Sequence, residues 1–276
     1  MSFLHDLLDL IVPETCAGCG RDGAALCRIC AVPLTLDPRP APLPVRPSGV
    51  RCWTVADYAG TVRKVINAHK EQGRTPLTRP LAEALTRALR AAQPPPATPG
   101  EASPPTLTQE LSAPLPRQTA NSSPRGIVPK PSTPRTRGTT SPQHASPSAP
   151  AGPDRIHVVP IPSARRAVRR RGDDPMLNIT RTAVRTLTNE GLAFVLTTAL
   201  KQARPVADQA ALTRTERIAN LKGALAATRP LDGARVIVVD DIVTTGATLT
   251  EAVRTLRRAG AHVLAAATIA ATTRTT

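Results

Sequence analysis

Apolar side chains recur along the chain with two different periods, and these periods predict its elements. Helical spacing indicates helices over residues 3–11, 61–70, 76–92, 177–188 and 248–259. Apolar runs that are short or alternating indicate strands over residues 53–58, 156–159, 192–196, 235–239 and 262–268. Beyond residue 154, strands and helices take turns, which is the order of a mostly parallel sheet with helices on its faces. We therefore expect an α/β fold.

Residues 93–153 interrupt this pattern. They contain 16 of the 30 prolines, no aromatic residue and few large aliphatic side chains. Such a segment cannot bury enough apolar surface to offset the entropy lost on ordering, so we expect a disordered insert rich in Pro, Ser and Thr. We expect an N-terminal helix with a cysteine cluster over residues 1–50 and the first part of the sheet domain over residues 51–92. The insert follows over residues 93–153, and the rest of the sheet domain over residues 154–276.

The chain of 276 residues carries a formal net charge of +16 and a pI near 11.2, which favours anionic partners. Residues 154–230 contribute +8 of this charge and the insert only +3. Arginine supplies 31 of the 36 basic residues, a bias that GC-rich coding also produces. No apolar run is long enough for a membrane helix, and Asp6 and Asp9 stand where a secretion signal is positively charged. We expect a cytoplasmic protein without membrane insertion.

Four cysteines form two closely spaced pairs, Cys16 with Cys19 and Cys27 with Cys30. In a reducing compartment this spacing indicates tetrahedral Zn²⁺ held by four thiolates, a closed structural site that stabilises a region too small for its own core. A redox dithiol is the alternative. Cys52 is expected to be a small buried side chain rather than a fifth ligand.

A buried strand over residues 235–239 leads into two acids and a threonine-rich turn, and then into a helix. Ligands bind at this carboxyl edge of a parallel sheet, and the free amides and hydroxyls at the helix start form a cradle for a phosphate monoester. The acids would accept hydrogen bonds from ribose hydroxyls, with a divalent cation nearby. An ordinary turn with an Asp-capped helix is the alternative, but it leaves the second acid and the three threonines unexplained. The candidate residues are Asp240, Asp241, Thr244, Thr245, Gly246, Ala247 and Thr248.

This string resembles the phosphoribosyl pyrophosphate (PRPP) signature of type I phosphoribosyltransferases. The run from Val158 to Arg166 is similar to the pyrophosphate loop of the same enzymes, which implies Ser163, Ala164 and Arg165 as pyrophosphate-binding residues. Five arginines lie between residues 165 and 171. A solvated helix face is the alternative explanation for each of them, but bidentate phosphate recognition is expected of at least one.

Taken in order, the motifs resemble those of the ComF family of competence-associated, phosphoribosyltransferase-like proteins. Besides the cysteines and the acidic string, the matching segments are residues 58–64, 69–74, 159–162, 170–172 and 204–220. The resemblance implies a type I phosphoribosyltransferase fold with a four-cysteine zinc knuckle, and a hood over the site at residues 204–220, including Arg204 and Gln209. Many members carry Arg-Gly-Phe-Asn-Gln where this chain has Arg171-Gly172 followed by Asp173-Asp174-Pro175.

Two functions follow from this resemblance. One is an enzyme of nucleoside metabolism that transfers the phosphoribosyl group of PRPP, with Mg²⁺, to an acceptor and releases pyrophosphate; its catalytic residues are not indicated. The other is a PRPP-binding module that handles single-stranded DNA during DNA uptake, with competence proteins as partners. For the second function the charge is suitable, but the chain has only Phe3, Trp53, Tyr58 and Phe194 as aromatic residues for base stacking.

Overall fold

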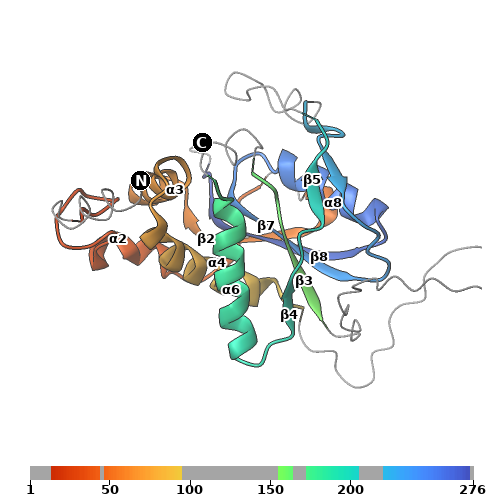
Figure 1. The fold of residues 1–276 in the computed structure, drawn as a ribbon, viewed down its shortest axis with the longest axis horizontal. Helices are drawn as coiled ribbons and strands as arrows, with labels where there is room; N and C mark the ends of the chain where they lie inside the picture. The colour runs from red at the N-terminus through yellow and green to blue at the C-terminus, as the bar shows by residue number, and fades with distance from the viewer. Residues whose placement is uncertain (1–13, 44–46, 95–154, 164–171, 205–219, 274–276) are drawn as a thin grey trace, which may run out of the picture. The chain divides into compact units, whose positions relative to one another are not determined.

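A six-stranded sheet organises the computed structural model, which describes residues 14–43, 47–94, 155–163, 172–204 and 220–273 (Figure 1). The strand order is β1-β2-β8-β7-β3-β4, and only β1 runs antiparallel to its neighbour. The strands are β1 (Arg39–Pro40), β2 (Arg51–Asp57), β3 (Ile156–Pro160), β4 (Phe194–Leu196), β7 (Arg235–Val243) and β8 (His262–Ala271). The chain before residue 95 thus adds β1 and β2 to a sheet whose other four strands come from residues after 154.

This arrangement confirms the expected mostly parallel α/β fold and all five expected strands. The end of β7 differs from the expected end of that strand at residue 239. Strand β7 continues past Val239 and includes both acids, because Asp240 and Ile242 still pair with Thr268 and Ala270 of β8. The acids are therefore held by the rigid end of a strand instead of by the turn that follows it.

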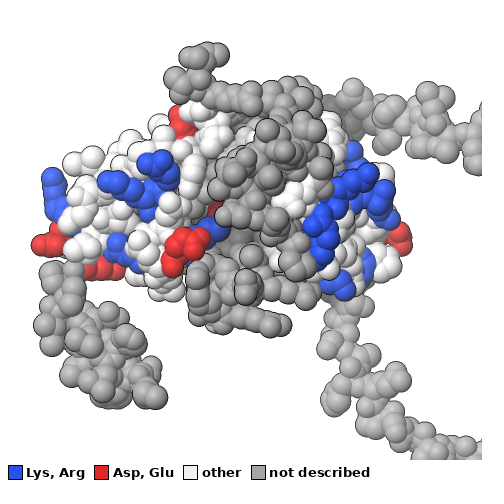
Figure 2. All heavy atoms as spheres, turned by 90° about the horizontal axis from the view of Figure 1, so that it is seen from above, with Lys and Arg blue, Asp and Glu red and all other residues white. Residues whose placement is uncertain are grey.

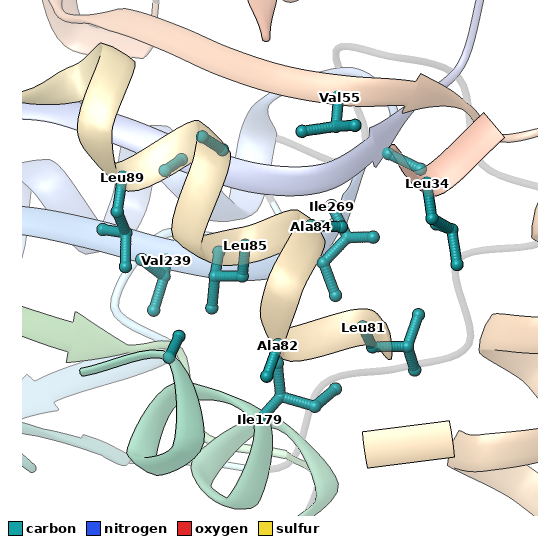
Figure 3. Close-up of a cluster of buried hydrophobic side chains, with 14 of the residues drawn as sticks. Leu34, Val55, Leu81, Ala82, Ala84, Leu85, Leu89, Ile179, Val239 and Ile269 are labelled. Atoms are coloured by element: carbon teal, nitrogen blue, oxygen red, sulfur yellow. The ribbon is translucent and has the colours of Figure 1, made fainter. Parts of the chain in front are cut away.

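Helices cover both faces of the sheet. On one face lie α4 (Thr78–Ala92) and α6 (Pro175–Asn189), and on the other lies α8 (Ala247–Arg258). Successive β7 residues serve the two faces in turn: Ile237 and Val239 pack with α4 and α6, whereas Val236 and Val238 pack with α8. Figure 3 shows the first of these cores, in which Leu85 and Leu89 of α4 lie near Val239 of the sheet and Ala82 lies next to Ile179 of α6.

The remaining described elements are α2 (Arg28–Ala31), α3 (Gly60–Gln72), the 3₁₀ turns η1 (Val32–Leu34), η2 (Pro47–Gly49) and η3 (Thr75–Leu77), and an antiparallel pair, β5 (Leu200–Gln202) and β6 (Leu225–Ala227). The four expected helices within the described ranges are confirmed as α3, α4, α6 and α8. Strands β1, β5 and β6 were not expected, because two or three residues are too few to show a period. The expected helix over residues 3–11 and residues 95–153 of the insert lie outside the described ranges.

The position of Leu85 on α4 leads to a stability prediction. Its side chain has no exposed surface and lies in the core shown in Figure 3. Leu85→Ala should lower the free energy of unfolding by about 3 kcal/mol, because it removes buried contacts and leaves a cavity. Glu83→Ala, at an exposed position of the same helix, should change it by less than about 0.5 kcal/mol. Denaturant titration of both variants tests this, and equal losses would contradict the assigned core.

Candidate functional site

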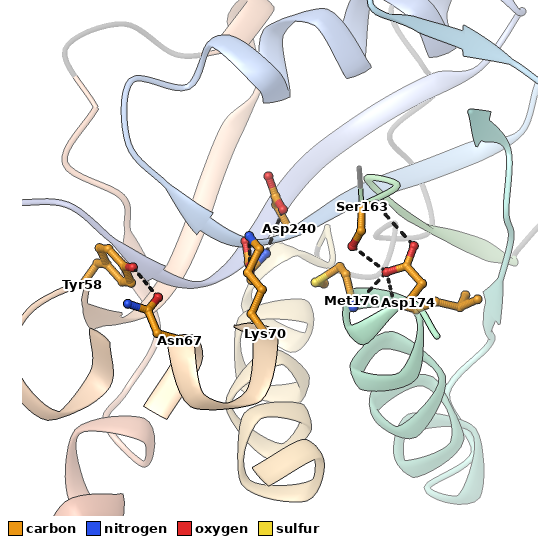
Figure 4. A network of polar contacts seen from close by, with 9 residues as sticks. Tyr58, Asn67, Lys70, Ser163, Asp174, Met176 and Asp240 are labelled. Carbon is orange, nitrogen blue, oxygen red and sulfur yellow. Dashed lines mark hydrogen bonds and ion pairs between the residues drawn. The ribbon is translucent and has the colours of Figure 1, made fainter. Parts of the chain in front are cut away.

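The carboxyl end of β7 places two acids next to a lysine from a different part of the chain. The Lys70 Nζ lies 2.7 Å from Asp241 Oδ2, and the backbone N–H of Asp241 donates to Asp240 Oδ1 at 2.9 Å. Figure 4 shows Lys70 extending from α3 toward this end of the strand. The Asp241 side chain is only 13% exposed, and that of Lys70 is 38% exposed. The acids are thus held beside a cation that lies 171 positions away in the sequence.

Burial and neighbouring charges shift the pKa values of Asp240 and Lys70. Burial raises the pKa of Asp240 well above its usual value, the neighbouring Asp241 raises it further, and Lys70 partly opposes both effects. Burial alone would lower the pKa of Lys70, but the charges of Asp241 and Asp240 outweigh it and raise that pKa to about 12. Lys70 is therefore a cation at neutral pH, and it compensates a pair of carboxyl groups that repel each other.

The threonine-rich turn joins β7 to the start of α8. Gly246 is the N-cap residue with a φ of 77°, in the left-handed region that favours glycine, and a Cβ there would lie 3.3 Å from Pro47 Cγ. No side chain caps α8 from this position; the Ala247 N–H donates to Thr245 Oγ1 at 3.4 Å. Thr244 is exposed and Thr248 is half-buried. Residues 244–248 thus bring hydroxyls and helix-start amides together directly after the acids, an arrangement suited to an anion.

Ser163 follows β3 at the same edge of the sheet, and its polar groups are bonded to Asp174. The Ser163 hydroxyl donates to Asp174 Oδ1 at 2.7 Å, and its backbone N–H donates to Oδ2 at 3.3 Å. Asp174 is also the N-cap of α6 and accepts from the Met176 N–H at 3.1 Å (Figure 4). An incoming pyrophosphate would have to replace this carboxylate on Ser163. Ala164 and Arg165 lie outside the described residues.

Residues 204–220, the expected hood, are described only at their two ends. The Arg204 guanidinium donates to the backbone oxygens of Asn220 and Lys222, at 2.6 and 3.0 Å. Beyond them, the Gly223 N–H donates at 2.7 Å to Glu251, a buried residue of α8. Arg204 therefore joins the two ends of the segment, and Glu251 links the returning end to the helix that starts at the threonine-rich turn. Gln209 lies outside the described residues.

The four paired cysteines meet in one cluster, with all four Sγ atoms within 4.8 Å of one another. Cys19 Sγ and Cys27 Sγ are 3.8 Å apart. A tetrahedral zinc with Zn–S bonds of about 2.3 Å has a ligand separation of about 3.8 Å, so the arrangement fits this metal. All four thiols are free of disulfides. Cys52 lies apart in the α8-side core at 4% exposure, which confirms its interpretation as a buried side chain.

Two thiols of the cluster differ in ionisation. Burial acts to raise the pKa of Cys16, but backbone N–H groups, that of Cys27 first among them, lower it to about 6. For Cys30, burial and the neighbouring thiols raise the pKa to about 12. At least one ligand is thus ready as a thiolate at neutral pH, and a cation would favour deprotonation of the others.

The cysteine cluster rests against α3. Gly18 has no space for a side chain, because a Cβ there would lie 2.7 Å from Cys30 Sγ and 2.6 Å from Thr61 Cγ2. The Lys64 Nζ donates to the Gly18 oxygen at 3.2 Å, and Arg74, just after α3, donates to the Thr15 oxygen. The cluster and the acidic end of β7 lie on separate elements, but α3 contacts both of them.

Lys70 and Asp174 are the site residues that sequence reasoning did not assign. Lys70 stands within the run 69–74 that contributed to the family resemblance, but nothing local indicates its partner. For Asp174 a signal was present, since an Asp directly before Pro175 is typical of a helix N-cap followed by proline at the first helical position. The departure at residues 173–175 is therefore a capping sequence.

Comparison with known families supports the class of fold and site. Residues 170–276 match the family model described as Phosphoribosyl transferase domain. The matched range contains the acids, the threonine-rich turn and α6, and it supports a type I phosphoribosyltransferase-like domain. A comparison with curated proteins finds no match. Among the described helices, none is long and apolar enough to cross a membrane.

The cysteine geometry predicts one tightly bound zinc per chain. Elemental analysis of protein purified without added metal should find it. Cys27→Ser should reduce the stoichiometry to well below one, because three thiolates and a hydroxyl hold zinc less tightly. Cys52→Ala removes a cysteine outside the cluster and should leave one zinc per chain. Neither zinc nor iron in the wild-type protein would contradict the assignment.

Proposed function

We propose that this chain binds PRPP together with Mg²⁺ at the carboxyl end of β7. The proposal depends on one observation. Two acids at the end of β7 are followed directly by a turn in which Gly246 caps α8 and which contains hydroxyls and helix-start amides. Ribose hydroxyls are hydrogen-bond donors and phosphate is an acceptor, so one sugar phosphate satisfies both parts of this turn. The match of residues 170–276 to the phosphoribosyl transferase domain supports the same ligand.

In this proposal each segment of the candidate site has a distinct task. Residues 244–248 bind the 5′-phosphate, and the Asp240 and Asp241 carboxylates accept hydrogen bonds from the ribose hydroxyls. Ser163, Ala164 and Arg165 bind the pyrophosphate group. Carboxylate oxygens are suitable Mg²⁺ ligands alongside substrate phosphates, and the bound metal supplies charge neutralisation for the leaving pyrophosphate. The hood, with Arg204 at its base and Gln209 within it, covers the bound ligand.

The reaction we propose is phosphoribosyl transfer. A base or amine acceptor forms a bond to C1 of the ribose, the bond from C1 to the pyrophosphate oxygen breaks, and pyrophosphate leaves with its electron pair. Basic groups that stabilise the leaving charge supply most of the catalysis in such a step. The resemblance to ComF proteins supports a ComF-type protein that acts in the cytoplasm. If the chain instead handles single-stranded DNA, we propose competence proteins as its partners.

A second candidate function, binding of single-stranded DNA, is favoured by an arginine-lined hollow. The hollow has a volume of about 620 Å³, and its lining includes Arg229, Arg254 and Arg258. Figure 2 shows basic side chains gathered at the end of the molecule where Figure 1 places α8. Two of these arginines, Arg254 and Arg258, come from α8, and Arg229 comes from residues 154–230, the segment expected to contribute +8 of the charge. An open, basic surface suits the phosphate backbone of a nucleic acid.

The acids and Gly246 lead to a prediction of PRPP affinity in the presence of Mg²⁺. Asp241→Asn should weaken binding about tenfold or more, since a charge-assisted hydrogen bond is worth roughly 1.5–3 kcal/mol. Gly246→Val should weaken it further, because a β-branched residue disfavours a φ of 77° and its side chain would contact Pro47. Titration calorimetry on folded variants tests this. Equal affinities for all three proteins would show that the turn does not bind PRPP.

The second candidate has its own test. Single-stranded oligonucleotides should bind with micromolar affinity and little sequence preference, and log affinity should fall linearly with log salt. Arg229→Ala combined with Arg258→Ala should reduce both the affinity and the salt slope, whereas Arg79→Ala, on exposed α4 surface, should change neither. Pyrophosphate release from PRPP, measured with a panel of bases and amines, separates the enzyme from the binding module. Absence of oligonucleotide binding at low salt would eliminate the second candidate.

A further inference from the structure

Lys70 is bonded to a carboxyl group that could also bind a metal ion. It is the described cation that is ion-paired with the acidic end of β7, at 2.7 Å from Asp241 Oδ2. Its helix, α3, precedes residue 95, so it lies outside the range that matches the phosphoribosyl transferase domain. An ammonium group and a divalent cation at the same carboxylate repel each other, so each weakens the binding of the other.

The helix that carries Lys70 is fixed on several sides. The His69 Nε2 lies 2.9 Å from Thr78 Oγ1 of α4, and Lys64 and Arg74 bond to backbone oxygens of the cysteine cluster. Val65 and Ile66 of the same helix are buried in the core. Movement of the Lys70 ammonium group therefore requires rotation of its side chain and not movement of α3. This side chain is 38% exposed and has four flexible methylene groups.

We propose that Lys70 is an internal counter-ion that exchanges partners when the ligand binds. Without ligand its ammonium group neutralises Asp241 and keeps divalent metal affinity low. When Mg²⁺ enters with PRPP, Asp241 is released to the ribose and metal, and the ammonium turns to the diphosphate of the ligand. The second half of this exchange rests on the proposed function, whereas the competition between Lys70 and metal does not.

The exchange has a physical advantage for a site of this composition. With Lys70 in place, the two acids remain compensated when no ligand is present. On binding, the metal compensates the carboxylates, and the lysine offsets part of the phosphate charge as a compact point charge. Metal and PRPP should consequently bind with positive coupling.

Lys70→Met tests the competition directly, because methionine keeps an apolar stem and removes the charge. Mn²⁺ affinity, measured by electron paramagnetic resonance without PRPP, should increase at least tenfold. Lys70→Arg retains the charge and should stay within twofold of the wild type. Arg63→Met removes a charge from an exposed position of the same helix and should also stay within twofold. Lys70→Met binding Mn²⁺ no more tightly than Arg63→Met would overturn the proposal.

A second measurement uses the wild-type protein and so does not depend on the folding of a variant. Saturating Mn²⁺ should displace the ammonium group from Asp241 and increase the labelling rate of Lys70 by an amine-reactive reagent, as read by mass spectrometry. The labelling rate of Lys201, an exposed lysine of β5, is the internal control and should not change. An unchanged labelling rate of Lys70 at saturating metal would contradict the exchange.

PRPP affinity in the presence of Mg²⁺ completes the test. Lys70→Met should bind PRPP at least tenfold more weakly, although it binds Mn²⁺ more tightly; loss of a merely structural residue would weaken both. If the wild type fails to bind PRPP while the Mn²⁺ effect is present, the proposed function fails and the competition stands. If the wild type binds PRPP and the Mn²⁺ effect is absent, the exchange fails and the proposed function stands.

Discussion

The repulsion between two adjacent carboxyl groups at the buried end of a strand is the constraint on which this site depends. Asp240 and Asp241 continue the pairing of β7 with β8, so the sheet holds them together whether or not a ligand is present. Burial raises the pKa of Asp240, and its neighbour adds to that effect. A site of this kind needs positive charge close by. In the described structure Lys70 supplies it, and the Mg²⁺ that accompanies PRPP would supply it in the bound state that we propose.

This need connects parts of the chain that are far apart in sequence. Lys70 reaches the acids only because α3 is held between the cysteine cluster and α4. The cluster is small and has little core of its own, so a metal that fixes its four cysteines also fixes one side of α3. The residues before 95 and after 154 therefore contribute to one site, and β2, which pairs with β8, keeps their sheet continuous.

Local patterns were sufficient to predict much of this structure. The apolar run of β7, the threonine-rich turn and the paired cysteines are each contained in a few consecutive positions, and each is found where the sequence placed it. The ion pair of Lys70 was not predictable, since contacts across 171 positions leave no periodic signal. Strands β1, β5 and β6 were missed because two or three residues are too few to show a period. Asp174 could have been recognised as a helix cap from the proline that follows it.

The central claim is that the acids and the threonine-rich turn form one site for PRPP with Mg²⁺. Calorimetric titration of the wild-type protein with PRPP, once with Mg²⁺ and once with a chelator too weak to remove zinc from a four-thiolate site, tests it most directly. We predict saturable binding of one PRPP per chain that weakens at least tenfold when Mg²⁺ is removed. Absence of binding under both conditions, by protein shown to be folded and to contain zinc, would contradict the account.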